Sequence, residues 1–230
     1  DATGRLHAEQ TLPCADFPGP SAAIAAYLRQ TTASRPRRAA LAVATPISGD
    51  RIEFTNNAWS FSTEAVRQEL GLERLAIVND FTALALALPL LASDERRAIG
   101  RGTAMADAPI GLIGPGTGLG VSGLIRAGQQ WIPLQTEGGH VTFAATDQRE
   151  WAISRVLQRQ FGHASLERLL SGPGLVNLYH ALAEVEGWTA ESLTPADITA
   201  RGLTDACPHC RAVLDLFCGA LGTAAGNLAI

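Results

Sequence analysis

Asp80 stands where a short buried strand is predicted to run directly into an apolar helix. Residues 75–78 are apolar and bounded like a strand, and residues 81–88 continue as a helix that Pro89 stops. Open α/β sheets bind ligands at the carboxyl ends of their strands, and the helix dipole there favours an ionised carboxylate. Asp80 is therefore a candidate base, although Asn79 and Asp80 are equally the residue types that cap a helix.

A glycine-rich turn follows a second predicted strand at residues 110–113. Four glycines within residues 114–120 let backbone N–H groups approach an anion closely, which is typical of a phosphate cradle, while a mobile hairpin turn is the alternative. Residues 118–123 also match the dinucleotide pattern G-x-G-x-x-G, which would indicate a nicotinamide oxidoreductase. That pattern requires a following helix, and the residues after Gly123 alternate like a strand.

Carboxylate and amide side chains elsewhere in the chain suit a sugar ligand. Glu137 and His140 flank two glycines, and Glu167 precedes a Ser-Gly-Pro-Gly segment. Each alone resembles an ordinary solvated or capping group. Together with Asn56 and Asn79 they supply the acceptors and donors that neighbouring sugar hydroxyls need.

The sequence Cys207-Pro208-His209-Cys210 can be half of a zinc site or a redox pair. No second Cys/His pair stands at ligand spacing, and Cys218 falls eight residues on within a helical pattern. Neither zinc nor redox chemistry is favoured on these grounds.

The composition excludes several classes of protein. Of 230 residues, 47% are hydrophobic and 17% charged, as in ordinary globular proteins, and all 18 basic residues are arginine, which rules out a mechanism that needs lysine within this stretch. The net charge of −4 and the scattered arginines predict no nucleic-acid partner. No apolar stretch is long enough to predict a membrane span, and four unevenly placed cysteines predict a reducing cytoplasm.

Hydrophobic periodicity and capping signals predict strands with crossover helices, followed by a β-meander and a helical region. In the first part the expected strands are 5–11, 39–44, 51–54 and 75–78, and the expected helices 21–30, 62–71 and 81–88. In the second part the strands are 110–113, 121–126 and 131–134, and the helices 147–161, 165–170, 174–186, 195–201 and 208–230. The pattern predicts two α/β domains, 1–90 and 91–230, divided where charged and small residues collect between 89 and 107.

Five motifs in one order carry a resemblance to a known family. They are residues 55–62 (TNNAWSFS), 79–83 (NDFTA), 116–121 (GTGLGV), 137–141 (EGGHV) and 167–179 (ERLLSGPGLVNLY). The chain resembles the bacterial ATP-dependent glucokinases over nearly all of its length. It departs from them mildly at Pro115 and at Gln135-Thr136, which replace a small Pro-Gly pair.

The resemblance implies an α/β fold of the two-lobe, ribonuclease H-like or actin-like (hexokinase-type) class. It implies that Asp80 takes the proton from the 6-hydroxyl of glucose as that oxygen attacks the γ-phosphate of MgATP, giving glucose 6-phosphate at the entry to glycolysis. The implied sugar-binding residues are Asn56, Asn79, Asp80, Glu137, His140 and Glu167. The implied phosphate-binding residues are Gly116, Thr117, Gly118 and Gly120.

The same resemblance implies a cytoplasmic homodimer that needs ATP, with Mg²⁺ carried by the nucleotide and no protein metal site. The family's first phosphate loop and its adenine-binding segment are expected to lie before Asp1 and after Ile230, so the 230 residues alone are expected to lack kinase activity and to aggregate. The main alternative is a sugar-binding sensor or inactive paralogue that keeps the sugar pocket.

Overall fold

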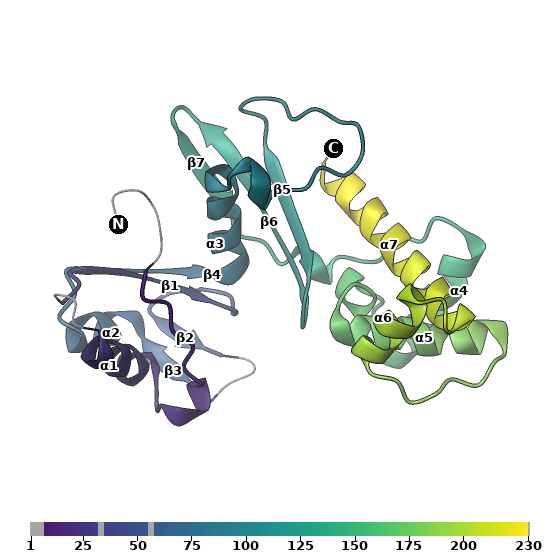
Figure 1. The fold of residues 1–230 in the computed structure, drawn as a ribbon, viewed down its shortest axis with the longest axis horizontal. Coiled ribbons are helices and arrows are strands. Elements are labelled where there is room, and N and C mark those ends of the chain that lie inside the picture. Colours follow the sequence, from purple (N-terminus) through teal and green to yellow (C-terminus); the bar gives the residue numbers. More distant parts are fainter. Residues whose placement is uncertain (1–6, 32–34, 55–57, 230) are drawn as a thin grey trace. The chain divides into compact units, whose positions relative to one another are not determined.

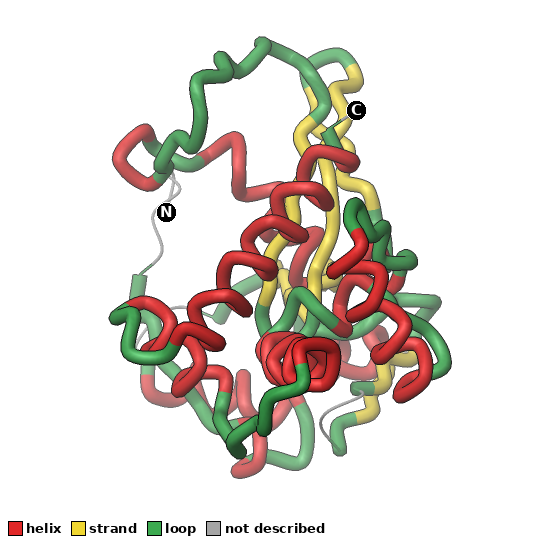
Figure 2. The backbone as a smooth tube through the Cα atoms, turned by 90° about the vertical axis from the view of Figure 1, so that its right-hand side faces the viewer, coloured by secondary structure: helices red, strands yellow, loops and turns green. Residues whose placement is uncertain are grey.

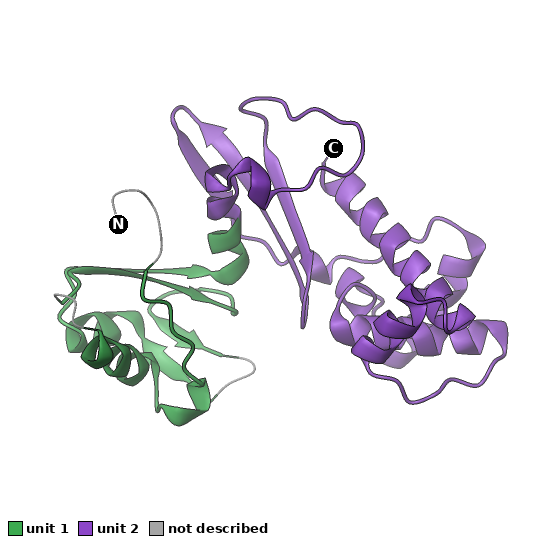
Figure 3. Ribbon diagram, viewed as in Figure 1, with its two compact units in different colours: residues 1–84 green, residues 85–230 purple. Residues whose placement is uncertain are grey.

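The computed structural model describes residues 7–31, 35–54 and 58–229 and is shown as a ribbon in Figure 1. The chain forms two compact units, residues 1–84 and 85–230 (Figure 3), and each is described by itself. The two units meet after residue 84, and the domain division after residue 90 that the sequence predicts stays a prediction.

The first unit is built on a pair of parallel strands. Strand β1 (Arg38–Val43) pairs with β4 (Arg74–Asn79), so that Val43 lies opposite Asn79 at the carboxyl end. The connection between them contains a short antiparallel pair, β2 (Arg51–Glu53) and β3 (Ser60–Ser62), and helix α2 (Thr63–Glu69). Helix α1 (Pro20–Gln30) precedes β1, and α3 (Asp80–Ala87) follows β4 without a break and crosses the boundary between the units. A short 3-10 turn (Cys14–Asp16) precedes α1.

Local sequence signals account for most of these elements. Ser62 begins α2 as predicted, because its hydroxyl oxygen accepts a hydrogen bond from the Ala65 amide at 3.1 Å. Strand β3 was not expected, since it consists of the three residues just before that helix.

The strand expected at residues 5–11 is wrong over its described part, residues 7–11, which form a loop. No strand of the described residues pairs with this segment. Ala8 has a positive φ of 55°, which a strand does not allow, and its carbonyl accepts a hydrogen bond from the Tyr27 hydroxyl instead.

The sheet of the second unit is an antiparallel meander. Its strands are β5 (Ile110–Pro115), β6 (Leu119–Ala127) and β7 (Gln130–Leu134), in the order β5-β6-β7. Two 3-10 turns, Leu88–Leu90 and Ser93–Glu95, come before it. Strand β6 continues four residues past Gly123 where a dinucleotide motif would need a helix, so the structure excludes the oxidoreductase interpretation of that motif.

Four helices complete the unit and are drawn in red in Figure 2: α4 (Gln148–Phe161), α5 (Gly172–Glu186), α6 (Pro195–Leu203) and α7 (Pro208–Leu228). Fully buried apolar side chains from all four form its core, including Leu157, Leu182, Ile198 and Val213. Two 3-10 turns, Gly138–His140 and Leu166–Arg168, contact each other, and the first also contacts β6 while the second contacts α5.

Two details of the helical region differ from expectation. The helix predicted at 165–170 is wrong: only the 3-10 turn Leu166–Arg168 forms, because Ser171 caps the start of α5 immediately afterwards. The spacing of Asp147 and Glu150 predicts a capping box, and only half of it forms. Asp147 caps α4 by accepting from the Glu150 amide, whereas the Glu150 carboxylate accepts hydrogen bonds from the amide and hydroxyl of Thr146 rather than from the Asp147 amide.

Among the residues described, no helix is both long and apolar enough to cross a membrane.

We expect the second unit's stability to depend on its helical core. Replacing Leu182, which is 0% exposed, with alanine should lower the free energy of unfolding by about 2–5 kcal/mol, because it removes buried methyl groups and leaves a cavity. The matched control is Leu203→Ala, since this side chain is 69% exposed at the end of α6. Urea unfolding followed by circular dichroism measures both, and equal losses would contradict this account of the core.

Candidate functional site

The junction of β4 and α3 places Asn79 and Asp80 at the end of a parallel strand. Asn79 caps the helix: its side-chain Oδ1 accepts hydrogen bonds from the amides of Phe81 at 2.9 Å and Thr82 at 3.2 Å. One oxygen of Asp80, Oδ1, also accepts from the Phe81 amide at 2.9 Å. Asn79 therefore acts as a helix cap, and so does one of the two carboxylate oxygens of Asp80.

The second carboxylate oxygen of Asp80, Oδ2, has no hydrogen-bond partner in the part of the chain that the structure describes. The side chain is partly exposed, and its other oxygen is fixed by the backbone. Asp80 thus presents a free acceptor from a restrained position, which is what a general base requires.

In the second unit the glycine-rich turn forms the tip of the β5–β6 hairpin. Pro115 pairs with Leu119, and residues 116–118 make the turn, closed by a hydrogen bond from the Gly116 amide to the Gly118 carbonyl at 2.8 Å. The amides of Thr117 and Gly118 donate to no acceptor among the described residues. Two neighbouring free N–H groups at an exposed tip can bind an anion.

Two hydrogen bonds hold the hairpin tip, one to the 3-10 turn Leu166–Arg168 and one to the first residue of α5. The Leu119 amide donates to Glu167 Oε2 at 2.9 Å, and the Gly172 amide donates to the Gly116 carbonyl at 2.8 Å. A Cβ atom on Gly118 would stand 2.5 Å from Glu167 Oε2. The alternative of a loosely held hairpin turn does not fit these contacts.

The two carboxylate oxygens of Glu167 differ in their hydrogen bonds. Oε2 holds the hairpin, whereas Oε1 makes no hydrogen bond within residues 7–31, 35–54 and 58–229. The partly buried side chain can contact a ligand through Oε1 while it holds the glycine-rich turn.

Two glycines bring the segment between Glu137 and His140 against strand β6. A Cβ on Gly139 would lie 2.2 Å from the Leu119 carbonyl oxygen, and one on Gly138 would lie 2.8 Å from the Val121 side chain. The Thr136 hydroxyl adds a hydrogen bond to the Val121 carbonyl at 2.8 Å, which gives this departure from the family pattern a specific structural role.

Glu137 and His140 lie at the two ends of this short turn, with His140 Nε2 and Glu137 Oε2 3.9 Å apart. Their side chains are 59% and 62% exposed, so both are accessible to a ligand. The backbone that carries them is fixed by the glycine contacts, although the side chains themselves are free to adjust.

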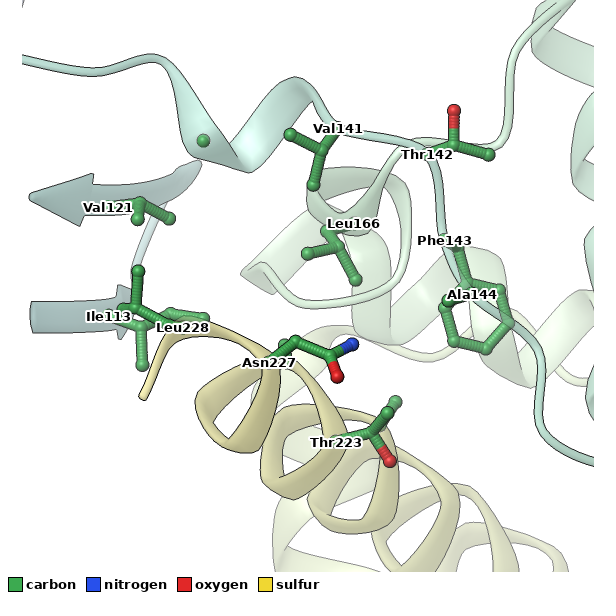
Figure 4. A pocket seen from close by; sticks show the side chains of 13 residues that line it. Ile113, Val121, Val141, Thr142, Phe143, Ala144, Leu166, Thr223, Asn227 and Leu228 are labelled. Carbon is green, nitrogen blue, oxygen red and sulfur yellow. The ribbon is translucent and has the colours of Figure 1, made fainter. Parts of the chain in front are cut away.

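An apolar pocket of about 220 Å³ adjoins this turn within the second unit (Figure 4). Gly138 and Val141 line it from the turn, and Figure 4 shows Thr223 and Asn227 of α7 on the side opposite Val141. Of the residues expected to bind sugar, none lines it, and its few polar groups cannot satisfy a set of sugar hydroxyls. The remaining lining residues are Ile113, Val121, Thr142, Phe143, Ala144, Leu166, Ala220, Ala224 and Leu228.

Comparison with known proteins identifies the family. The family model for glucokinase matches residues 1–230. The chain belongs to the glucokinase family. A glucokinase of Aromatoleum aromaticum is 50% identical over 222 residues, which cover 96% of this chain and 67% of that protein. The chain thus spans about two thirds of the length of the curated relatives it matches.

Solved structures agree with this assignment. A glucokinase from an Antarctic psychrotroph superimposes with a TM-score of 0.86 at 40% identity, covering 96% of this chain and 68% of that one. The glucose complex of Balamuthia mandrillaris glucokinase superimposes with a TM-score of 0.68 over 82% of this chain and 59% of that one, at 21% identity, and so shows the shared fold. The predictions of a glucokinase and of its α/β, hexokinase-type fold are confirmed at this level.

The structure brings together only some of the residues singled out from the sequence. Glu167 and the glycine-rich turn are in direct contact, and Glu137 and His140 share one turn. Asn79 and Asp80 are neighbours at the β4–α3 junction, while Asn56 lies outside the described residues. The hydrogen bond between Leu119 and Glu167 was not expected, because no local signal marks two residues 48 positions apart as partners.

Gly139→Ala should disturb the placement of Glu137 and His140 in this glucokinase. The added methyl group meets a backbone carbonyl rather than a flexible side chain, so the turn must move away from β6. We expect weaker glucose binding in calorimetry and a lower melting temperature. Gly219→Ala is the control, since nothing lies within 4 Å of a Cβ there, and it should leave both quantities close to wild type. Unchanged glucose affinity in Gly139→Ala would contradict the role given to this contact.

Proposed function

We propose that the full-length protein transfers the γ-phosphoryl group of ATP to the 6-hydroxyl of glucose, with Asp80 as the general base. The observation that carries this proposal is the asymmetry of the Asp80 carboxylate, whose Oδ1 accepts from the Phe81 amide while Oδ2 has no partner among the described residues. A base restrained in this way can receive the hydroxyl proton without first breaking a helix-capping bond. Phosphoryl transfer depends mainly on alignment and charge stabilisation, so a well-placed proton acceptor suffices on the protein side.

Glucose is recognised in this proposal by carboxylate, imidazole and amide groups that accept from and donate to its hydroxyls. Glu137 and His140 offer exposed polar atoms from a turn whose backbone is fixed, and Glu167 offers Oε1. Asn79 uses Oδ1 to cap α3, which leaves its Nδ2 amide to donate to a hydroxyl. Asn56 keeps the sugar-binding role that its sequence motif predicts.

ATP phosphates are bound in this proposal by the tip of the β5–β6 hairpin, comprising Gly116, Thr117, Gly118 and Gly120. The amides of Thr117 and Gly118, which find no acceptor in the described part of the chain, are the donors available to phosphate oxygens. Mg²⁺ arrives bound to the nucleotide, where it neutralises charge on the transferring phosphoryl group. Among the described residues, no cluster of three or more His, Cys, Asp or Glu side chains is suited to hold a metal ion.

The family resemblance further supports a cytoplasmic homodimer that supplies glucose 6-phosphate to glycolysis. Light scattering of the full-length protein tests the dimer, with a monomer at micromolar concentration as the contradicting result.

Asp80→Asn should lower kcat by ~10² or more while glucose binding is largely kept, because asparagine retains an oxygen for the Phe81 amide but cannot take a proton. Steady-state kinetics and calorimetric glucose titration measure the two effects. Asp94→Asn, an exposed carboxylate in a 3-10 turn, is the matched control and should have wild-type kinetics. Near wild-type turnover in Asp80→Asn would make this residue a helix cap only. A wild-type protein that binds glucose without phosphorylating it would favour a sugar-binding sensor.

Replacing Glu137 or Glu167 with glutamine should raise the KM for glucose by roughly tenfold, because each change weakens a charge-assisted hydrogen bond to a hydroxyl. The KM for ATP should change much less. Glu167→Ala separates the two uses of this side chain: alanine cannot accept from the Leu119 amide, so here the KM for ATP should rise as well. If glutamine and alanine at this position affect both substrates alike, the two oxygens do not have separate roles.

A further inference from the structure

The N-terminus of α7 carries a pair of thiols with different environments. Cys207 is the N-cap residue of the helix and is half-buried, while Cys210 lies in its first turn and is 0% exposed. Both are free cysteines. Cys207 is therefore the residue of the pair that a small molecule can reach, whereas Cys210 is enclosed by the protein.

The polar contacts of the two sulfurs differ in the same sense. The Cys210 amide donates to Cys207 Sγ at 3.5 Å, so the backbone of the helix start supports negative charge on this sulfur. Burial raises the pKa of Cys207, but the hydrogen bonds from the backbone and side chain of Cys210 and from the His209 amide outweigh it and lower this pKa below its usual value. Burial and the hydrogen bond with Cys207 raise the pKa of Cys210 to about 11.

The spacing of the pair fits a disulfide without rearrangement of the helix. Residues three apart at a helix start have Cα atoms about 5 Å apart, from the helical rise and radius. Disulfides join Cα atoms at separations of about 4.4–6.8 Å. The helix is closely packed here, because a Cβ on Gly202 of α6 would lie 2.9 Å from the Cys210 carbonyl oxygen. This packing restrains the backbone that carries Cys210.

Side chains from three neighbouring segments surround the pair. Tyr179, from α5, lies close enough that the two thiols contribute to its raised pKa, whose main cause is burial. The His209 ring stacks on Trp188 with centroids 4.1 Å apart. Arg201 is paired with Glu191 at 2.9 Å. None of these side chains joins the cysteines in a cluster of three metal-binding groups within the described residues.

We propose that Cys207 and Cys210 form a redox-active dithiol that exchanges reversibly with small-molecule disulfides. The Cys207 thiolate attacks one sulfur of the disulfide, forms a mixed disulfide and releases one thiolate. Cys210 then loses its proton and attacks Cys207 Sγ, which forms the internal disulfide and releases the second thiolate. The protein dithiol is oxidised, and the small-molecule disulfide is reduced to two thiols.

The internal disulfide should be readily reversible. It closes a very short loop, so it gains little from restricting the unfolded chain, in contrast to disulfides that close long loops. Its accessible sulfur also leaves it open to attack by thiols. This site is independent of the proposed kinase residues and does not rest on their roles.

The experiment uses the full-length protein equilibrated in buffers of reduced and oxidised glutathione, followed by rapid alkylation and peptide mass analysis. We expect a reversible Cys207–Cys210 disulfide that forms in a single transition. Cys210→Ser should accumulate the mixed disulfide of Cys207 with glutathione, because the resolving thiol is missing. Cys207→Ser should leave Cys210 reduced, since a buried thiol of raised pKa attacks poorly.

The matched control is the Cys14→Ser and Cys218→Ser double variant, which removes the two exposed cysteines and should keep the transition unchanged. Circular dichroism of each variant in native buffer shows whether it is folded. The proposal is overturned if both cysteines of the folded wild-type protein remain alkylated as free thiols in fully oxidised glutathione, or if the internal disulfide forms only after the protein is unfolded.

Discussion

The hydrogen bond from the Leu119 amide to the Glu167 carboxylate joins the antiparallel sheet of the second unit to its helical part. It acts where strand β6 begins, one residue after the glycine-rich turn. The Gly172 amide reinforces it by donating to Gly116 on the other side of the turn. A carboxylate acceptor makes this bond stronger than one between neutral groups. The position of the proposed phosphate-binding amides, and the freedom of Glu167 Oε1 to meet a hydroxyl, both depend on it.

Close backbone contacts extend this constraint to the rest of the candidate site. Leu119 is the common element: its amide binds Glu167, and its carbonyl leaves no room for a side chain on Gly139. The same residue of β6 therefore fixes the helical segment on one side and the Glu137–His140 turn on the other. The Leu119 carbonyl thus requires glycine at position 139, and the Val121 side chain leaves as little room for a Cβ at position 138.

The sequence predicts those features of the fold that depend on residues close to one another along the chain. Ser62 and Asp147 cap helices through bonds to amides three residues ahead, as predicted, and the meander follows from alternation and turns. The cap at Ser171 has the same local geometry but was not predicted. The motif order pointed to the glucokinase family because five short segments had to agree. The bond between Leu119 and Glu167 could not be predicted, since only the fold brings them together. For the same reason the expected strand is wrong over residues 7–11: a strand needs a partner as well as a suitable sequence, and no strand of the described residues pairs with this segment.

Helix α7 relates the thiol pair to the rest of the second unit. Cys210 and Asn227 lie seventeen positions apart on this one continuous helix, which corresponds to about 26 Å along its axis. An effect of oxidation at one end could reach the apolar pocket at the other only if the helix moved as a whole. The spacing of Cys207 and Cys210 already suits a disulfide, and the contact of α6 with the Cys210 carbonyl opposes such a movement. Thiol exchange at the start of α7 is thus expected to be local chemistry, separate from the residues proposed to bind glucose.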